Sequence, residues 1–473
     1  MTQSASAPNR TPHSNYPAQE VREPAVAGAF YPAAPAALRK QVDELLAAAP
    51  DLDLPAPKAI VAPHAGYIYS GALAAQAYAR LRPARDRIRR VILLGPAHRV
   101  AFQGIAVPTV AAFQTPLGPV RVDREAAAAI ADMPQVHQLD AAHALEHSLE
   151  VHLPFLQRVL DDVAVLPLVV GPTEPLAVAQ VLDRLWGGPE TAIVISSDLS
   201  HYHGYDDARG RDSATASRIE ALDFGRIDGH GACGAYPLNG LLLMARHRGL
   251  CATRIGLCNS GDTAGDRSRV VGYGAWAFSP CGTREFAVGQ RHAMLDLAAR
   301  AIRSGLRNGK RPEVRSETFA PPLQTLRACF VTLKKEARLR GCIGSLAATR
   351  PLAADIAWNA WSAAFADPRF PKLAPQELAG LNLGISVLSP PHPLHVEGEA
   401  DLKAKLRPGV DGLIIADGDR RATFLPQVWE DLQDADTFLA HLKRKAGMAP
   451  DHWSDSMQVS RYTAESFAAP VPG

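Results

Sequence analysis

The chain has 473 residues, of which 47% are hydrophobic and 21% are charged, and these values are typical of a globular protein with two or three domains. Its formal net charge of +2 is close to neutral for this length, so the charge gives no indication of a nucleic-acid partner. No apolar run is long enough to span a bilayer. Residues 1–20 are rich in Ser, Pro, Asn and Gln, which predicts a disordered tail and no signal peptide. We therefore expect a cytoplasmic protein with neither a membrane nor a nucleic-acid partner.

After the tail, short apolar runs alternate with helical patterns as far as residue 280. Runs typical of buried strands occur at 58–62, 90–94, 164–170, 192–196, 254–258 and 270–278. This alternation predicts a three-layer α/β/α domain over 21–280. A turn-rich stretch from Ser279 to Thr283 marks its boundary, and we assign 281–287 to a linker. The helix and the shorter strands that follow predict a smaller α+β domain over 288–465.

Polar side chains follow three of the predicted strands at their C-terminal ends. His64 and His98 each come after a proline that ends a strand, because proline cannot donate to a sheet ladder. The run 192–196 ends shortly before Asp198 and His201, without a proline. Parallel strands joined by helices bring such residues to one edge, which is where open α/β sheets bind ligands. We therefore expect a site at this edge.

Cys233 lies in a glycine-rich loop before a helical pattern at 237–246. A helix N-terminus lowers the pKa of a thiol and favours the thiolate that a metal requires. Two neutral imidazoles, His64 and His98, together with this thiolate would suit iron, copper or zinc. The alternative is a buried cysteine that packs as a small hydrophobic residue.

Asp198 and His201 would supply an acid–base pair beside such a metal, or would orient one of its ligands. Alternatively, Asp198 caps a helix and His201 faces solvent. A helical run is expected from Glu146 to Leu160, and it would place His147 and Glu150 on one face, with His152 beyond them, as metal ligands or as a hydrogen-bonded pair. The six cysteines are irregularly spaced without a CxxC pair, which argues against a zinc knuckle and against a disulfide framework.

Five motifs of the first domain resemble those of the Memo family. They are Ala27-Gly28-Ala29-Phe30-Tyr31-Pro32, Ala62-Pro63-His64-Ala65-Gly66-Tyr67, Leu94-Gly95-Pro96-Ala97-His98, Glu146-His147-Ser148-Leu149-Glu150-Val151-His152-Leu153-Pro154 and Ser197-Asp198-Leu199-Ser200-His201. The fold of that family resembles the LigB-type, class III extradiol dioxygenases, which bind non-haem iron.

The resemblance implies a metal pocket with His64, His98 and Cys233 as ligands, lined by Asp198 and His201. On its substrate side we place four further residues, Tyr67, His147, Glu150 and His152. A cysteine stands where the dioxygenases have a carboxylate, so ring cleavage does not simply carry over to this chain.

The second domain resembles the AMMECR family over residues 288–464. The resemblance rests on Leu339-Arg340-Gly341-Cys342-Ile343-Gly344, Ala366-Asp367-Pro368-Arg369-Phe370-Pro371 and Glu377-Leu378. For Arg340, Cys342, Asp367 and Arg369 we weigh two interpretations. Either they line a substrate- or protein-binding groove with Cys342 as a nucleophile, or the glycines form a tight turn, Cys342 is packed and Asp367 pairs with Arg369.

A fusion of these two domains resembles the bacterial and archaeal AmmeMemoRadiSam system, whose members accompany a radical S-adenosylmethionine (SAM) enzyme. No CxxxCxxC cluster occurs in this chain, so the radical chemistry would belong to a separate partner. Our leading hypothesis is that a redox-capable metal, iron or copper, serves the oxidation or modification of an unidentified small molecule or peptide, with His201 exchanging protons. The alternatives are a non-catalytic module that holds a peptide or metal for the radical enzyme, and a zinc hydrolase with Asp198 or Glu150 as base.

Overall fold

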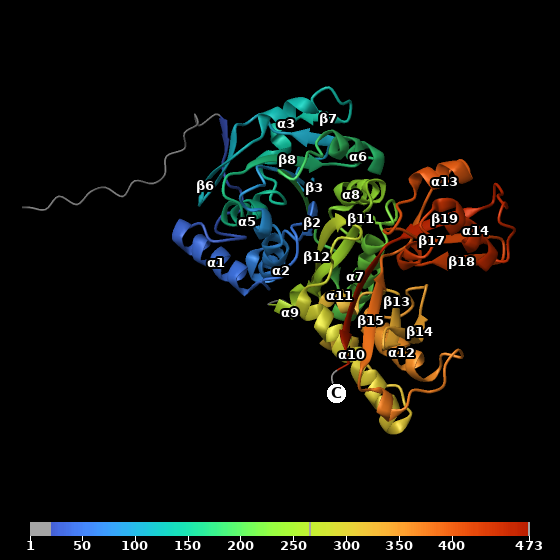
Figure 1. The fold of residues 1–473 in the computed structure, drawn as a ribbon. Helices are drawn as coiled ribbons and strands as arrows, with labels where there is room; N and C mark the ends of the chain where they lie inside the picture. Colours follow the sequence, from blue (N-terminus) through green and yellow to red (C-terminus); the bar gives the residue numbers. More distant parts are fainter. Residues whose placement is uncertain (1–19, 264–265, 472–473) are drawn as a thin grey trace, which may run out of the picture.

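The structure is a computed structural model that describes residues 20–263 and 266–471. The tail expected at 1–20 therefore lies, except for Glu20, outside the described residues. Figure 1 shows two bodies in chain order, an α/β domain in blue to green and a smaller body in yellow to red. Both expected fold classes are confirmed.

A mixed sheet of nine strands forms the centre of the first domain, as far as the described residues show. Its order is β10-β12-β2-β9-β3-β8-β4-β7, and β11 pairs with β12 outside that path. The core strands β2, β9, β3 and β8 are parallel, whereas β11 and β12 form a long antiparallel pair. The strands are β2 (Ala59–Ala62), β3 (Arg90–Pro96), β4 (Ile105–Val107), β7 (Val136–Gln138), β8 (Ala164–Val170), β9 (Thr191–Ser196), β10 (His201–His203), β11 (Leu250–Asn259) and β12 (Val270–Pro280).

Helices cover both faces of this sheet, and successive strand residues point to opposite faces. Ile60 and Ala62 belong to one buried core, while Ala59 and Val61 belong to the other. The first core includes α1 (Pro35–Ala48), α2 (Tyr67–Ala79) and α5 (Leu153–Val159); the second includes α6 (Pro175–Arg184), α7 (Tyr205–Glu220) and α8 (Ala235–Arg248). The expected three-layer α/β/α arrangement is therefore present.

Shorter elements complete the first domain. A small sheet contains β1, β5 and β6 in that order. These elements are β1 (Val21–Arg22), β5 (Ala112–Thr115), β6 (Gly118–Arg121), α3 (Arg124–Ala129), α4 (Asp140–Ala144), α9 (Ser260–Thr263), and the 3-10 turns η2 (Arg82–Ala84) and η3 (Glu150–His152).

The helix expected from Glu146 to Leu160 is wrong in its first half. The chain turns through 146–149, forms η3, and begins α5 only at Leu153. Pro154 stands in the first turn of that helix, where a missing N–H and a fixed φ are tolerated best. The His147 and Glu150 side chains consequently do not share a helical face.

The second domain has two four-stranded sheets, in the orders β14-β13-β15-β20 and β16-β19-β17-β18. Helices α10 and α12 pack with the first sheet in one core, and α14 packs with the second. The elements are α10 (Val288–Asn308), η4 (Ser316–Thr318), α11 (Pro321–Gln324), β13 (Cys329–Lys335), β14 (Arg338–Gly344), α12 (Leu352–Phe365), η5 (Pro375–Glu377), β15 (Leu381–Leu388), β16 (His392–Pro393), α13 (Glu399–Lys405), β17 (Gly412–Asp417), β18 (Arg420–Phe424), η6 (Pro426–Glu430), α14 (Ala435–Lys445), β19 (Gln458–Tyr462) and β20 (Ala464–Pro470).

Ion pairs and hydrogen bonds connect the two domains through the segment between β12 and α10. Arg284 pairs with Asp53 of the first domain at 3.0 Å. Glu285 accepts a hydrogen bond from Arg327 at 3.1 Å and donates its backbone N–H to Glu465 at 2.6 Å. The connection is therefore held from both sides.

A disulfide joins Cys251 to Cys281, although the irregular spacing of the cysteines argued against a disulfide framework. In the antiparallel β11–β12 ladder, Cys251 lies opposite Ser279 and Leu250 opposite Pro280. Residues separated by 30 positions are thereby brought together, and irregular spacing along the sequence gave no sign of it. Among the described helices, none is long and apolar enough to cross a membrane.

Candidate metal centre

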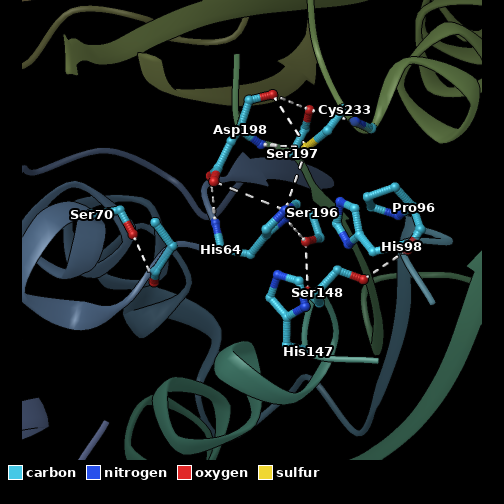
Figure 2. A network of polar contacts seen from close by, with 12 residues as sticks. His64, Ser70, Pro96, His98, His147, Ser148, Ser196, Ser197, Asp198 and Cys233 are labelled. Atoms are coloured by element: carbon cyan, nitrogen blue, oxygen red, sulfur yellow. Dashed lines mark hydrogen bonds and ion pairs between the residues drawn. The ribbon is translucent and has the colours of Figure 1, made fainter. Parts of the chain in front are cut away.

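His64 lies directly beyond β2 and is buried at the sheet edge (Figure 2). Its backbone N–H donates to Asp198 Oδ1 at 2.8 Å, and its Nδ1 lies 2.6 Å from Ser196 Oγ. The single hydroxyl hydrogen of Ser196 goes to the carbonyl of Ser148 at 2.6 Å. Ser196 Oγ must therefore accept a hydrogen bond from His64 Nδ1–H, which leaves the lone pair on His64 Nε2.

His98 is oriented by the carboxylate of Glu146. The two oxygens of Glu146 accept from His98 Nδ1 at 2.9 Å and from the His98 backbone N–H at 2.6 Å. Burial raises the pKa of Glu146, but hydrogen bonds from His98 and from the Ser148 amide outweigh it and lower the pKa to about 2. An ionised carboxylate can only accept, so Nδ1 of His98 carries the proton and Nε2 carries the lone pair.

His147 joins these two histidines. Its ring stacks on His98 with centroids 4.8 Å apart and meets His64 edge-on at 5.5 Å. One ligand nitrogen from each of the three rings lies within 4.8 Å of the others. His147 Nδ1 is 3.4 Å from Glu146 Oε1 but forms no hydrogen bond. The turn at 146–149 thus points His147 into the cluster, whereas the sequence placed it on the substrate side.

Cys233 approaches the cluster from the far side of His64, with its Sγ 3.4 Å from His64 Nε2. Two hydrogen bonds connect Asp198 and Cys233. The Cys233 N–H donates to the Asp198 carbonyl at 3.2 Å, and the Asp198 N–H donates to Cys233 Sγ at 3.2 Å. Figure 2 shows the sulfur above the imidazoles of His64 and His98.

The expectation that the helix start lowers the pKa of Cys233 is wrong for the protein without a bound cation. Burial, and then the charge of Asp198, raise the pKa of the Cys233 thiol. Helix α8 begins only at Ala235, and the N–H of its Gly234 cap donates to Ser197 Oγ at 3.0 Å. The helix start therefore does not offset desolvation, and a thiolate here requires a bound cation to displace its proton.

Asp198 and His201 are not a hydrogen-bonded pair. His201 Nδ1–H donates to the Leu199 carbonyl at 2.8 Å, which leaves Nε2 as the acceptor. Burial lowers the pKa of His201. Burial also raises the pKa of Asp198 to about 7, although its carboxylate accepts from the His64 amide. Helix α7 starts at Tyr205, so Asp198 is not its cap, and both residues border the cluster independently.

Three residues expected on the substrate side belong to the core. Glu150 is fully buried, pairs with Arg22, and accepts from Tyr31 Oη at 2.5 Å. Tyr67 donates its hydroxyl to the Val151 carbonyl at 2.7 Å. These contacts fix the segment 22–31 against the turn before α5. Glu150 has no role as a catalytic base in this geometry.

His152 is also a core residue. Both of its ring nitrogens are buried without a hydrogen-bond partner among the described residues. Burial lowers its pKa to about 3, and its ring lies 5.8 Å from that of Tyr78. A neutral imidazole here packs like an aromatic side chain.

Sequence reasoning missed Glu146, Ser148 and Ser196. A histidine that binds a metal through one nitrogen needs an oxygen partner for the other. Glu146 lies beside His147 in a quoted motif, and Ser196 ends the strand before Asp198. The need for partners is general, but only the fold shows which oxygens meet which ring.

The polar residues singled out in the second domain bind one another. Arg340 forms two parallel hydrogen bonds to Glu377, at 2.7 and 2.9 Å. Asp367 accepts from Arg369 Nη2 at 2.8 Å and from the Cys342 amide at 2.9 Å. The Asp367–Arg369 pair is as the second interpretation expected, but its tight turn is wrong, because Arg340, Gly341 and Cys342 lie in strand β14. These contacts pin the loop 366–371 to β14, and we call them the Cys342 network.

Cys342 is half-buried on strand β14. Its Sγ lies 3.3 Å from Thr332 Oγ1, and within the described residues it has no histidine as a hydrogen-bond partner. A Cβ at Gly341 would lie 2.2 Å from the Ala363 carbonyl oxygen, so the glycine is required by close packing against α12. Nothing in these contacts activates Cys342 as a nucleophile.

Comparison with known proteins matches each domain separately. The family model described as Memo-like protein matches residues 22–277, and the AMMECR1 model matches residues 295–467. A MEMO1 family protein of Aquifex aeolicus is 38% identical over 268 residues, covering 54% of this chain and 97% of that protein. A MEMO1 family protein of Methanothermobacter thermautotrophicus is 37% identical and covers 54% of this chain and 98% of the relative.

Two further similar proteins each cover a shorter part of this chain. Another protein of M. thermautotrophicus is 40% identical over 176 residues, covering 37% of this chain and 91% of the relative. A crystal structure of an uncharacterized protein from Pyrococcus horikoshii is 34% identical, covers 38% of this chain and 91% of that chain, and has a TM-score of 0.35. The Memo model covers more than half of the described sequence, and the AMMECR1 match follows it without overlap. The chain therefore belongs to the Memo family and carries an AMMECR1 domain in the same polypeptide.

Proposed function

We propose that the Memo domain binds a redox-capable metal, iron or copper, through His64, His98 and Cys233, and uses it to oxidise or modify a small molecule or peptide. One observation carries this proposal. His64 and His98 each commit Nδ1 to a fixed oxygen, so both keep an Nε2 lone pair at the same cluster. Oxygen partners of this kind orient metal-binding histidines in proteins.

The available donors fit a borderline or soft metal. Imidazole nitrogens and a thiol favour iron, copper or zinc over Mg²⁺ or Ca²⁺, which prefer oxygen ligands. His147 is a second candidate for the third ligand, because its nitrogen groups with those of His64 and His98. When bound, such a metal supplies redox chemistry and an open position for substrate.

Residues around the cluster provide proton chemistry. His201 keeps Nε2 free because its Nδ1–H donates to the Leu199 carbonyl, and it takes up or releases a proton at that atom. Asp198 has a pKa raised to about 7 by burial, so its carboxyl group holds a proton in part of the molecules near neutral pH. This second group favours one alternative, a zinc hydrolase with Asp198 as base; Glu150 is excluded from that role by its pairing with Arg22.

A separate radical SAM enzyme is the partner we propose for the AMMECR1 domain. The support is that the two domains are fused in one chain and that this chain has no CxxxCxxC cluster of its own. Arg340 on β14 and the loop with Asp367 and Arg369 offer that partner a fixed surface. Binding of a peptide or metal without turnover is the non-catalytic alternative.

The test is metal content followed by turnover. Anaerobically purified protein is expected to hold about one equivalent of iron or copper per chain, and His64→Ala is expected to lower the affinity by at least about 100-fold. The exposed His137 provides a matched control, His137→Ala, which should bind normally. Comparing Cys233→Ser with His147→Ala identifies the third ligand, and Cys342→Ser controls for loss of a thiol.

Dioxygen consumption by the iron(II)- or copper(I)-loaded protein then separates the functions. Metal-dependent consumption that is lost in His201→Asn supports oxidation. Stoichiometric zinc without redox response supports hydrolysis. Equal metal content in wild type and His64→Ala would contradict the proposed site.

A further inference from the structure

A cavity of about 530 Å³ lies between the two domains, away from the histidine cluster. The first domain contributes the C-terminal end of α8, and the second contributes β16, the end of α13 and β19. Figure 1 shows α8 of the first domain beside α13 and β19 of the second. The volume falls within the range of cavities that bind small organic ligands.

The Arg, Lys and His side chains on the described wall of this cavity are basic, and no aspartate or glutamate lines it. They include Arg246, His247, His392, Lys405, Arg407 and Arg461. Phe224, Leu243 and Leu394 add apolar surface. The cavity therefore combines positive charge with room for an apolar group.

Two of these cations are neutralised within the protein and two are not. Lys405 pairs with Asp401 at 2.7 Å, and Arg407 pairs with Asp411 at 2.6 Å. Arg246 lies over the Phe224 ring at 5.7 Å, and within the described residues neither Arg246 nor Arg461 has a carboxylate partner. Two half-buried guanidinium groups from different domains thus face one cavity without a counter-ion.

His392 provides independent evidence that the cavity has an excess of positive charge. Its Nε2 atom is buried, and no described residue forms a hydrogen bond with it. Burial, and then the charges of Arg246 and Arg461, lower the pKa of His392 to about 4. Buried polar atoms usually have a hydrogen-bond partner. A ligand atom that bonds to His392 Nε2 would lie close to the charges of Arg246 and Arg461, which favours a negatively charged ligand.

A metal cation does not meet that requirement. Cys251, Cys281 and His392 place their ligand atoms within 4.8 Å of one another. The two sulfurs are joined in a disulfide, so they provide no thiolate, and the arginines repel a cation. The charge on the wall selects for an anion.

We propose that this interdomain cavity binds a small organic oxyanion, a phosphate or a carboxylate, through Arg246 and Arg461, with His392 as an additional hydrogen-bond partner. Guanidinium groups bind both oxyanions through two parallel hydrogen bonds. Because the two arginines belong to different domains, the ligand bridges the Memo and AMMECR1 domains. The site is separate from the proposed metal centre and does not depend on it.

The test is calorimetric titration of the full chain with sodium pyrophosphate and, separately, with sodium citrate at low salt. We expect at least one of the two to bind with a submillimolar Kd, and Arg246→Gln and Arg461→Gln each to weaken that binding by about 10-fold or more. Binding of pyrophosphate alone identifies phosphate as the ligand group, and binding of citrate alone identifies carboxylate. Arg444→Gln changes an exposed arginine of α14 outside the cavity and should leave the Kd unchanged.

Thermal unfolding provides a second measurement that does not depend on calorimetric heats. The bound anion should raise the Tm of wild type and of His64→Ala alike, and should not raise that of Arg461→Gln. Without ligand, Arg461→Gln should be at least as stable as wild type, because it removes an unpaired positive charge. If neither anion binds, or if Arg444→Gln weakens binding as much as Arg461→Gln, the proposal is wrong.

Discussion

The histidine cluster of the first domain and the Cys342 network of the second both consist of polar motif residues, yet their polar atoms are satisfied differently. In the Cys342 network, Asp367 and Arg369 bond to each other and Arg340 pairs with Glu377, and within the described residues one buried nitrogen, Arg340 Nη1, has no partner. In the cluster, Ser196 and Glu146 hold one nitrogen of His64 and of His98 and leave the other available. The number of polar motif residues therefore does not distinguish a functional site from a structural network. Unsatisfied polar atoms that converge on one point do.

Glu150→Gln tests a buried carboxylate whose hydrogen-bonding capacity is fully used within the core. The change leaves Arg22 buried without its counter-charge, so we expect the free energy of unfolding to fall by about 3–5 kcal/mol. Urea unfolding measures it. Metal stoichiometry of the folded fraction should remain that of wild type; selective loss of metal would instead place Glu150 at the site.

Glu146→Gln tests the carboxylate that orients His98. A neutral amide holds the His98 ring less firmly, so metal affinity should fall by about 10–100-fold. Competition with a chelator of known affinity measures this loss. The depressed pKa of Glu146 also stabilises the fold above the unfolded-state pKa, near 4.5, and this contribution disappears as pH falls toward 2. Acid unfolding of the variant should therefore be less steep in that window, and unchanged affinity would show that Glu146 does not support the site.

His152→Phe tests whether unsatisfied nitrogens alone are sufficient. His152 has two of them, but it lies in the core and its pKa is lowered to about 3. The unfolded state takes up a proton below about pH 6.5 while the folded state does not, so stability is present above that pH and falls as the solution is acidified. Wild type should lose about 2 kcal/mol more than His152→Phe between about pH 7.5 and 5. An equal pH response, measured by urea unfolding, would contradict the assignment of His152 to the core.

Asp367→Asn tests the pinned loop and should have the smallest effect. It weakens the hydrogen bonds that Arg369 and the Cys342 amide donate to this buried side chain, which corresponds to about 1 kcal/mol of stability. Metal content and dioxygen consumption should not change. A large loss of turnover with an intact fold would instead indicate that the Cys342 network is a catalytic site.

The positions of His64, His98 and Asp198 at one sheet edge could be predicted, because prolines and apolar runs mark where parallel strands end. The direction of His147 could not, since it depends on a turn that replaces the first half of an expected helix. The role of Glu150 and the Cys251–Cys281 pair depend on contacts between distant segments. Strand ends are local properties of a sequence, whereas side-chain partners are set by packing.

X-ray absorption spectroscopy of the iron- or copper-loaded full chain distinguishes the proposed ligand set, His64, His98 and Cys233, from the alternatives. The predicted spectrum contains imidazole nitrogens from His64 and His98 and one sulfur, and the sulfur contribution is lost in Cys233→Ser but kept in Cys342→Ser. Sulfur that is absent from the start, with a third imidazole, would assign the last ligand to His147. A shell of oxygen ligands without imidazole would contradict the account.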